Sequence, residues 1–166
     1  KDGPALYKAL IEENTTTDMS AEQIHRIGLE EVARIRHDML AIKDAVGFEG
    51  TLKEFFGHLR TDPQFKFASR QALLDGYNAI RARVDAAVPK LFTLTPDSRF
   101  EIRPVPGYSE ENEAAGSYRQ GTPDGTRPGI FFVNTYDLPS RTKPGMETLF
   151  LHEAIPGHHF QIALAQ

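Results

Sequence analysis

The sequence predicts an α+β protein that is mainly α-helical, with a helical bundle followed by a small β-sheet and a terminal helix. Apolar residues recur at helical spacing through residues 20–47, 51–62 and 69–88. Three short segments after residue 96 have strand character. We therefore expect one partial domain over 1–166, helical over 1–95, with the small sheet and a site-bearing helix over 96–166.

The predicted helices have recognisable ends. Ser20 followed by Gln23 has the spacing of a capping box, which marks the start of a long amphipathic helix. Thr51 and Glu54 repeat this spacing at the start of a shorter helix. We expect Pro89 to end the third helix, because proline lacks the amide hydrogen that continues the hydrogen-bond ladder.

The strand candidates differ in character. The segment GIFFVNT at 129–135 contains four consecutive apolar residues, which favours an interior strand. The segment GSYRQ at 116–120 is polar and favours an exposed edge. The segment RFEIR at 99–103 alternates as a strand does. Turn-rich links separate the three segments, so we expect a small sheet before the terminal helix.

The composition excludes several classes of protein. The formal charge is −4 and the basic residues are spread along the chain, so we expect no nucleic-acid partner. No apolar run reaches the ~18 residues that a membrane span needs. Cysteine is absent, so histidine and carboxylate side chains must supply any metal site. The chain lacks an initial methionine and stops within a predicted helix, and we expect it to be a fragment of a larger domain.

Candidate site residues lie in the C-terminal segment, LFLHEAIPGHHFQIALAQ. In the zinc-protease pattern H-E-x-x-H, the second histidine follows the first by one helical turn, so both imidazoles lie on one side. Here Pro156 occupies the position four residues after His152. On a straight helix His159 would lie roughly 10 Å further along the axis, and His158 would point about a third of a turn away. A straight helix therefore offers no shared metal site.

The Pro156–Gly157 pair changes this expectation. Proline removes the amide that would bond the His152 carbonyl, and glycine accepts backbone angles closed to other residues. We expect a bulge that returns His158 to the position of the usual second histidine. Glu153 would then point into the same cleft, accept a proton from a metal-activated water and return it to the leaving amine.

A structural interpretation of these residues stays open, because paired histidines on an apolar helix are often only hydrogen-bonded core or surface groups. His25, His37 and His58 lie in amphipathic helices without a surrounding group of carboxylates. We expect those three histidines to be structural.

The string FLHEAIPGHHFQIALAQ, with GIFFVNT ahead of it, closely resembles the bacterial family called domain of unknown function 885. The residues that match its H-E-x-x-P-G-H-x-x-Q signature are His152, Glu153, Pro156, Gly157, His158 and Gln161. The resemblance implies a gluzincin-like zinc peptidase, related at a distance to thermolysin. It also implies a lengthened H-E…H helix like that of dipeptidyl peptidase III.

Carried over by position, the resemblance implies that His152 and His158 bind Zn²⁺ and that Glu153 is the general base. His159 is a weaker candidate, which would contact substrate or orient a neighbour, and Gln161 has no role that we can derive. The third ligand would be a glutamate on a helix after Gln166. Because a catalytic zinc site needs three protein ligands, we expect this piece alone to bind zinc poorly and to be inactive.

In gluzincins an edge strand beside the zinc helix pairs with the backbone of an extended peptide, a form of strand addition. Tyr118, Arg119 and Asn134 are therefore weak substrate-contact candidates, and a plain scaffold sheet is the alternative. The function we predict is peptide hydrolysis in the full-length protein. A metal-dependent hydrolase of another amide or ester, or a non-catalytic peptide-binding module, stays open. The resemblance alone implies a bacterial protein exported to the periplasm or cell envelope.

Overall fold

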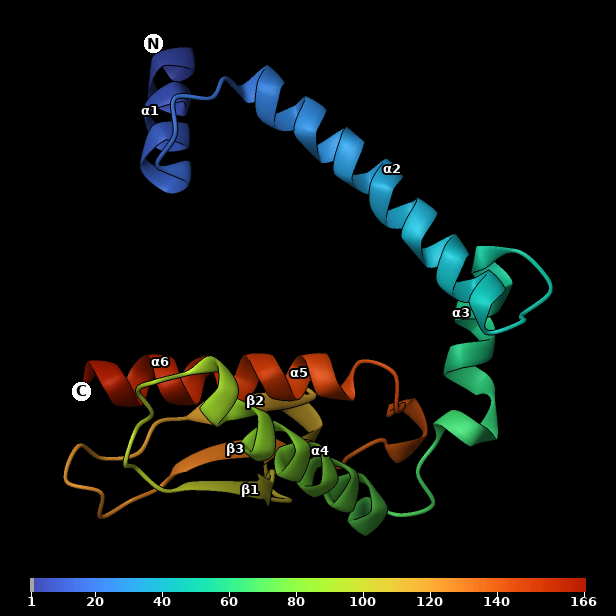
Figure 1. Cartoon of the computed structure of the whole chain (residues 1–166), viewed down its shortest axis with the longest axis vertical. Coiled ribbons are helices and arrows are strands. Elements are labelled where there is room, and N and C mark those ends of the chain that lie inside the picture. The colour runs from blue at the N-terminus through green and yellow to red at the C-terminus, as the bar shows by residue number, and fades with distance from the viewer. Residues whose placement is uncertain (1) are drawn as a thin grey trace. The chain divides into compact units, whose positions relative to one another are not determined.

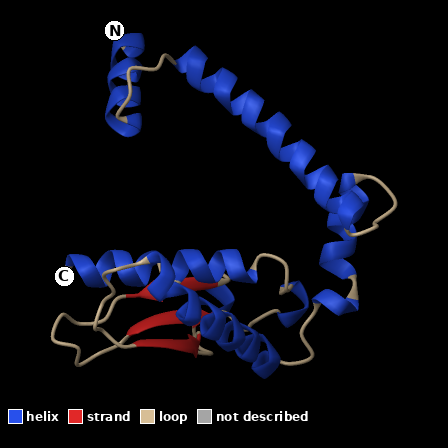
Figure 2. Cartoon of the chain, in the orientation of Figure 1, coloured by secondary structure: helices blue, strands red, loops and turns tan. Residues whose placement is uncertain are grey.

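The computed structural model describes residues 2–166, which are mainly helical and include a three-stranded sheet (Figures 1 and 2). The α+β class predicted from the sequence is confirmed. The chain divides into two compact units, one that ends at Phe56 and one that spans Gly57–Gln166. Within the described residues, no helix combines the length and apolarity needed to cross a membrane.

The first unit consists of α1 (Gly3–Thr15), α2 (Ala21–Ala45) and the beginning of α3 (Leu52–Thr61). The predicted capping box at the start of α2 is confirmed. The Gln23 amide donates to the Ser20 hydroxyl at 3.2 Å, and the Ser20 amide donates to the Gln23 side chain at 2.7 Å. These two bonds satisfy backbone groups that the first turn of a helix leaves free.

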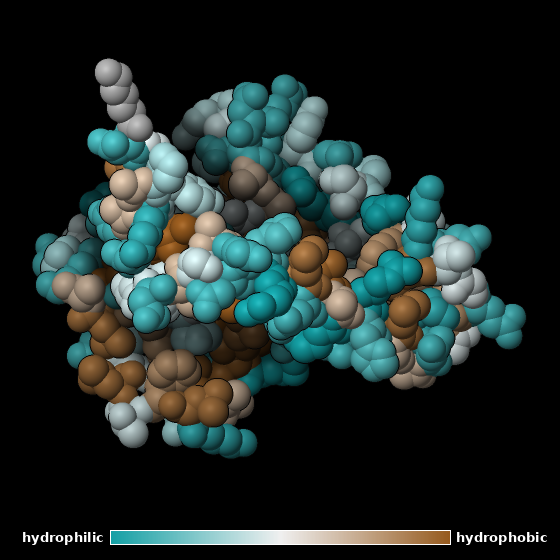
Figure 3. All heavy atoms as spheres, turned by 90° about the horizontal axis from the view of Figure 1, so that it is seen from above, coloured by the Kyte–Doolittle hydropathy of each residue, from teal (hydrophilic) through white to brown (hydrophobic). Residues whose placement is uncertain are grey.

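A second capping box begins α3, where Thr51 and Glu54 exchange the same pair of bonds at 2.7 and 3.2 Å. The apolar face predicted for α2 exists but stays largely exposed. Apolar side chains are visible at the surface in Figure 3, and those of α2 with large exposed fractions are Ile27, Leu29, Val32, Ile35, Met39 and Ile42. Within the described part of this unit, α1 and α2 do not pack extensively on each other, and the buried apolar side chains are those of Leu52 and Phe55 at the start of α3.

The sheet lies in the second unit and contains β1 (Phe100–Pro104), β2 (Gly116–Arg119) and β3 (Gly129–Val133). The strand order is β1-β3-β2, with β1 parallel and β2 antiparallel to β3. The central position of β3 and the edge position of β2 agree with the sequence prediction. Along β3, Phe131 and Val133 are buried while Phe132 is half-buried, so one face of the sheet forms the core.

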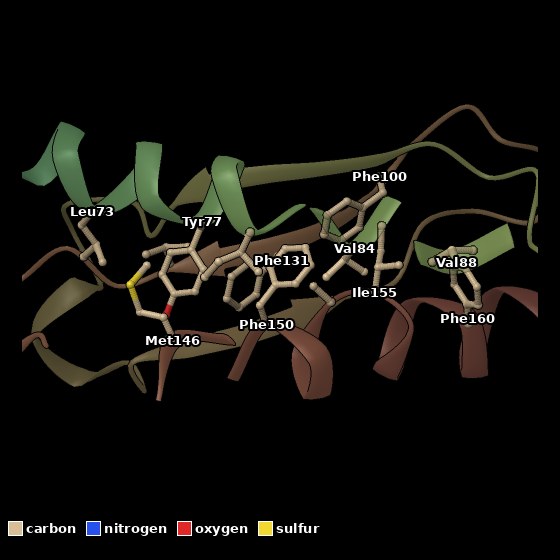
Figure 4. Packing of buried hydrophobic residues seen from close by; sticks show 13 residues of the cluster. Leu73, Tyr77, Val84, Val88, Phe100, Phe131, Met146, Phe150, Ile155 and Phe160 are labelled. Carbon is tan, nitrogen blue, oxygen red and sulfur yellow. The ribbon is translucent and has the colours of Figure 1, made fainter. Parts of the chain in front are cut away.

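The second unit also contains the end of α3 and, further along the chain, α4 (Arg70–Leu91), α5 (Met146–Glu153) and α6 (Gly157–Ala165). Helix α4 packs against β1 and α5, and α5 contacts β2. Figure 4 shows their apolar side chains meeting in one cluster, which includes Leu73, Tyr77, Val84, Val88, Phe100, Phe131, Met146, Phe150, Ile155 and Phe160. Short 3-10 helices occupy Pro63–Phe65, Glu110–Asn112 and Leu138–Ser140.

Two expectations differ from the structure. Helix α4 was predicted as part of a helical bundle, but it packs on the sheet and on α5. Helical periodicity identifies an apolar face without specifying its partner, and the apolar side of β3 serves as well as a second helix. Pro89 also does not end α4, which continues to Leu91, because a proline in the last turn removes only one ladder bond.

Truncating the centre of the core tests this packing. Phe150 is fully buried between α4 and the sheet, whereas its neighbour Leu151 is 40% exposed. We expect Phe150→Ala to lower the free energy of unfolding by about 3–5 kcal/mol, because it removes apolar contacts and leaves a cavity. Leu151→Ala, the matched control, should cost much less in the same urea titration. Equal losses for the two variants would contradict the assigned core.

Candidate metal centre

The predicted distortion between His152 and His158 is a complete break between two helices. Helix α5 ends at Glu153, and Ala154 has φ −113° and ψ −108°, outside the helical region. Helix α6 begins at Gly157, where the His159 amide donates to the Ala154 carbonyl at 3.1 Å. The prediction placed a bulge inside one continuous helix, so the site of the distortion was correct and its extent was underestimated.

Glycine is required at position 157 because the backbone of residues 151–152 leaves no room for a side chain there. A Cβ atom built on Gly157 would lie 1.8 Å from the carbonyl oxygen of His152, far inside van der Waals contact. The sequence prediction attributed this glycine to unusual backbone angles, but the structure shows a close approach of two backbone segments. The chain can therefore pass from the end of α5 into α6 in this way only if residue 157 has no side chain.

The break brings three candidate residues together. The imidazole rings of His152 and His158 lie 5.0 Å apart between centroids, at an interplanar angle of 83°. The Nε2 atoms of His152 and His158 each lie 3.9 Å from a carboxylate oxygen of Glu153. One ligand atom from each of the three residues lies within 4.8 Å of the other two. On a straight helix, the rings of His152 and His158 would be held apart.

The chemistry of this donor set suits a zinc ion. Imidazole nitrogen and carboxylate oxygen atoms bind zinc at about 2.0–2.2 Å, so two ligands of one ion lie at most about 4 Å apart. The spacing of up to 4.8 Å requires only small side-chain rotations to reach that separation. The side chain of His152 is 68% exposed and that of His158 is 39% exposed, so both can rotate and both can be reached from solvent.

Gln161, for which the sequence suggested no role, contacts His158. Its side-chain oxygen lies 3.3 Å from Nδ1 of His158, one turn earlier on α6. When Nδ1 carries the proton and donates it to this oxygen, Nε2, which lies 3.9 Å from a Glu153 oxygen, keeps the lone pair that a metal ion needs. The spacing of three residues within a helix was the available signal, because residues i and i+3 are neighbours on a helix surface.

His159 points into the protein. It is 3% exposed, and its Nδ1 lies 2.9 Å from the Tyr118 hydroxyl. Burial lowers the pKa of His159, opposed by a backbone hydrogen bond with Ser98, so the neutral ring is favoured. Burial also raises the pKa of Tyr118, opposed by a backbone hydrogen bond from Gly121. Of the two roles considered for His159, this position favours orienting a neighbour over contacting substrate.

Tyr118 links the sheet to the histidines. Its ring stacks at 6.4 Å on that of His158, while its hydroxyl meets His159. Gly129 on the neighbouring strand leaves room for this arrangement, because a Cβ at that position would overlap the Tyr118 hydroxyl and approach Nδ1 of His159 to 2.8 Å. Tyr118 is therefore the one sheet residue among the predicted candidates that lies beside the His152–Glu153–His158 group.

Arg119 and Asn134 lie elsewhere. Arg119 follows Tyr118 on β2 and points to the opposite face, where its guanidinium lies 5.1 Å from the Phe132 ring centroid. Asn134 is 1% exposed, and its amide nitrogen donates to the carbonyls of Glu110 and Glu113 at 2.7 and 2.8 Å. The position of Asn134 indicates a structural role that holds the loop before β2.

The open edge of β2 lies beside α5. Within residues 2–166, β2 pairs with β3 on one side and with no strand on the other. The Asn134 amide donates to the Ala115 carbonyl at 3.0 Å, which marks residues 115 and 134 as a hydrogen-bonded pair. Antiparallel pairing alternates, so Gly116 and Tyr118 direct their backbone N–H and C=O groups away from β3. Gly116 is buried and Tyr118 is half-buried, so the groups of Tyr118 are the more open of the two to an additional strand.

Comparisons with known proteins identify the family of this chain. The model of the family described as "Bacterial protein of unknown function (DUF885)" matches residues 1–166, and the chain belongs to this family. No curated protein matches the chain.

Among solved structures, the chain is similar to the crystal structure of "the putative lipoprotein from Colwellia psychrerythraea". The sequences are 36% identical, the TM-score is 0.86, and the match covers 99% of this chain. The match covers 29% of the Colwellia protein, so the chain spans less than a third of that protein's length.

Adding a methyl group at residue 157 tests the break. We expect Gly157→Ala to separate the ends of α5 and α6 and to lower the free energy of unfolding by about 1–3 kcal/mol, because the new Cβ overlaps the His152 carbonyl. The control is Gly57→Ala in α3, where a Cβ meets nothing within 4 Å and alanine favours the helix. Thermal and urea unfolding provide the measurement. A Gly157→Ala protein as stable as the control would show that the close approach is absent.

Proposed function

We propose that this chain carries the metal-binding and water-activating residues of a zinc-dependent peptidase of gluzincin type. The observation that carries the proposal is the meeting of His152 and His158 at one carboxylate, with both Nε2 atoms 3.9 Å from Glu153. Residues four apart on a helix would meet without any distortion. Here the chain breaks a helix to bring the two histidines together, and such distortions often accompany function.

The three side chains have distinct roles in this proposal. His152 and His158 would hold the metal through Nε2, and the contact between Gln161 and Nδ1 of His158 favours the tautomer whose Nε2 can bind a metal. A bound zinc ion supplies a Lewis acid that lowers the pKa of water to about 7. The Glu153 side chain is 18% exposed, less than either histidine, and faces both imidazoles. It accepts the proton of the attacking water and returns it to the leaving amine.

A peptide substrate is supported by the open edge of β2. The backbone groups of half-buried Tyr118 that point away from β3 can pair with an extended peptide, and the ring of Tyr118 stacks on that of His158. A peptide added to this edge would run past the metal-binding residues with its backbone held by hydrogen bonds. This arrangement favours peptides over simple esters or other amides, which offer no continuous backbone to pair.

The described residues supply two imidazoles and one carboxylate to this site. If Glu153 acts as the base, the third ligand comes from outside them, and the resemblance places a glutamate on a helix after Gln166. The Colwellia protein, of which this chain covers 29%, is long enough to include such a helix. We also propose a location in the cell envelope, which the description of that relative as a lipoprotein supports.

Replacing the base tests the proposal in the full-length protein. We expect Glu153→Gln to lower kcat for peptide hydrolysis by about 10²–10⁴-fold, because the amide cannot accept the proton of water. Zinc content should stay the same. Glu147→Gln is the matched control, since Glu147 lies on α5 in an exposed ion pair with Arg83. Unchanged turnover in Glu153→Gln would support a binding module instead, and cleavage of esters but not peptides would support the other hydrolase.

Zinc content tests the ligand count. We expect the full-length protein to retain about one zinc per chain after dialysis, and the 166-residue piece to lose it, because two histidine ligands alone hold zinc weakly. Metal analysis by mass spectrometry, before and after a chelator, is the measurement. Tight stoichiometric zinc in the 166-residue piece would mean that Glu153 or another residue within it completes the site.

A further inference from the structure

A cavity of about 220 Å³ lies at the N-terminal end of α5, away from the histidines. It lies between α4, the start of β2 and the segment before α5. The residues that line it include Tyr77, Ala115, Asn134, Arg141 and Leu149. Helix α5 begins at this cavity without a side-chain cap, so its first amide groups add positive potential there. The lining combines apolar side chains with polar groups.

Arg141 is the unusual member of this lining. Its Nε is buried and has no hydrogen-bond partner, and among the described residues no carboxylate forms an ion pair with its side chain. A buried guanidinium nitrogen without a partner costs free energy, which an anionic ligand would recover. Burial raises the pKa of Tyr77 to about 12, opposed by the charge of Arg141, so the Tyr77 hydroxyl stays protonated. Both groups can donate to an anion.

Hydrogen bonds to residues 64–66 fix the chain both before and after Arg141. The Lys66 ammonium donates to the Pro139 carbonyl, and the Lys143 ammonium donates to the Gln64 carbonyl at 2.7 Å. The Lys143 amide also donates to the Phe65 carbonyl at 2.9 Å. The guanidinium of Arg141 is therefore presented by a fixed backbone, as a binding site requires.

The cavity is in line with the proposed peptide path. Ala115, which lines it, directly precedes β2, and Leu149 lies under Gly116, where a Cβ would be 3.2 Å from the Leu149 side chain. His152 follows Leu149 by one helical turn, and Tyr118 follows Ala115 by about 10 Å of extended strand. The cavity is thus about two or three peptide residues from the metal-binding side chains.

The direction of the peptide follows from pairing and charge. Antiparallel pairing with β2, the more stable arrangement, points the C-terminal end of the peptide from Arg119 toward Gly116 and the cavity. The reverse direction would bring an N-terminal ammonium group to Arg141, and like charges repel. A terminal carboxylate is the peptide group that a protonated guanidinium and a phenol hydroxyl recognise.

We propose that this cavity binds the C-terminal carboxylate of a peptide paired with β2, so that the enzyme releases fragments of two or three residues from C-termini. The proposal deepens the function proposed above and rests on it. It assigns Arg141 as the specificity-determining residue, with Tyr77 as a second donor.

The test uses the full-length protein and two peptides of one sequence, one with a free C-terminal carboxylate and one with a C-terminal amide. Hydrolysis is followed by mass spectrometry, and binding to Glu153→Gln by calorimetry. We expect the free acid to be cleaved two or three residues from its end and to bind about 10- to 100-fold more tightly than the amide. Arg141→Gln should abolish this preference through KM, and Arg141→Lys should restore part of it.

The control is Arg127→Gln, because Arg127 is exposed on a loop outside the cavity, and within residues 2–166 its guanidinium has no hydrogen-bond partner. Equal cleavage of acid and amide, or a preference that survives Arg141→Gln, would overturn the cavity assignment and leave the peptidase function intact. Acid-selective binding that depends on Arg141, without hydrolysis of either peptide, would support the cavity and contradict the peptidase function. Failure of both peptides to bind would overturn the assignment.

Discussion

The candidate site depends on one backbone contact, the approach of Gly157 to the carbonyl of His152. Only a residue without Cβ fits there, and Pro156 ensures that the helix ladder is not continued through it. Helix α5 therefore ends at Glu153, and α6 begins at Gly157. The break brings together the two imidazoles, which six residues of straight helix would hold apart. The arrangement of His152, Glu153 and His158 follows from this contact.

The sheet and α4 hold the two short helices in place. The cluster of Tyr77, Phe131 and Phe150 fixes α5 against β3, and Phe160 with Phe92 extends the packing along α6. Tyr118 and His159 add a partly buried hydrogen bond between β2 and α6. The open edge of β2, the histidines and the cavity around Arg141 thereby lie on elements that pack on one core, which is how a fold keeps separate binding groups in register.

Much of the fold could be predicted from local signals. Capping boxes at Ser20 and Thr51 marked helix starts within a residue, and the polar character of 116–120 against the apolar run at 129–135 distinguished edge from centre. The partner of α4 could not be predicted, because an apolar stripe is the same whether it meets a helix or a sheet. The sequence predicts both Arg119 and Tyr118 as substrate contacts, but adjacent residues of a strand point to opposite faces, and only Tyr118 lies beside the histidines. Arg141 carried no sequence signal, since its isolation from carboxylates arises only in three dimensions.

The central claim is that the break between α5 and α6 makes His152 and His158 ligands of one metal ion. X-ray absorption at the zinc edge of the zinc-loaded full-length protein measures this directly, because it reports the number of imidazole ligands and their distance. The account predicts two imidazole nitrogens at about 2.0–2.1 Å, and one in His158→Ala. A spectrum without imidazole ligands, or one unchanged by His158→Ala, would contradict it.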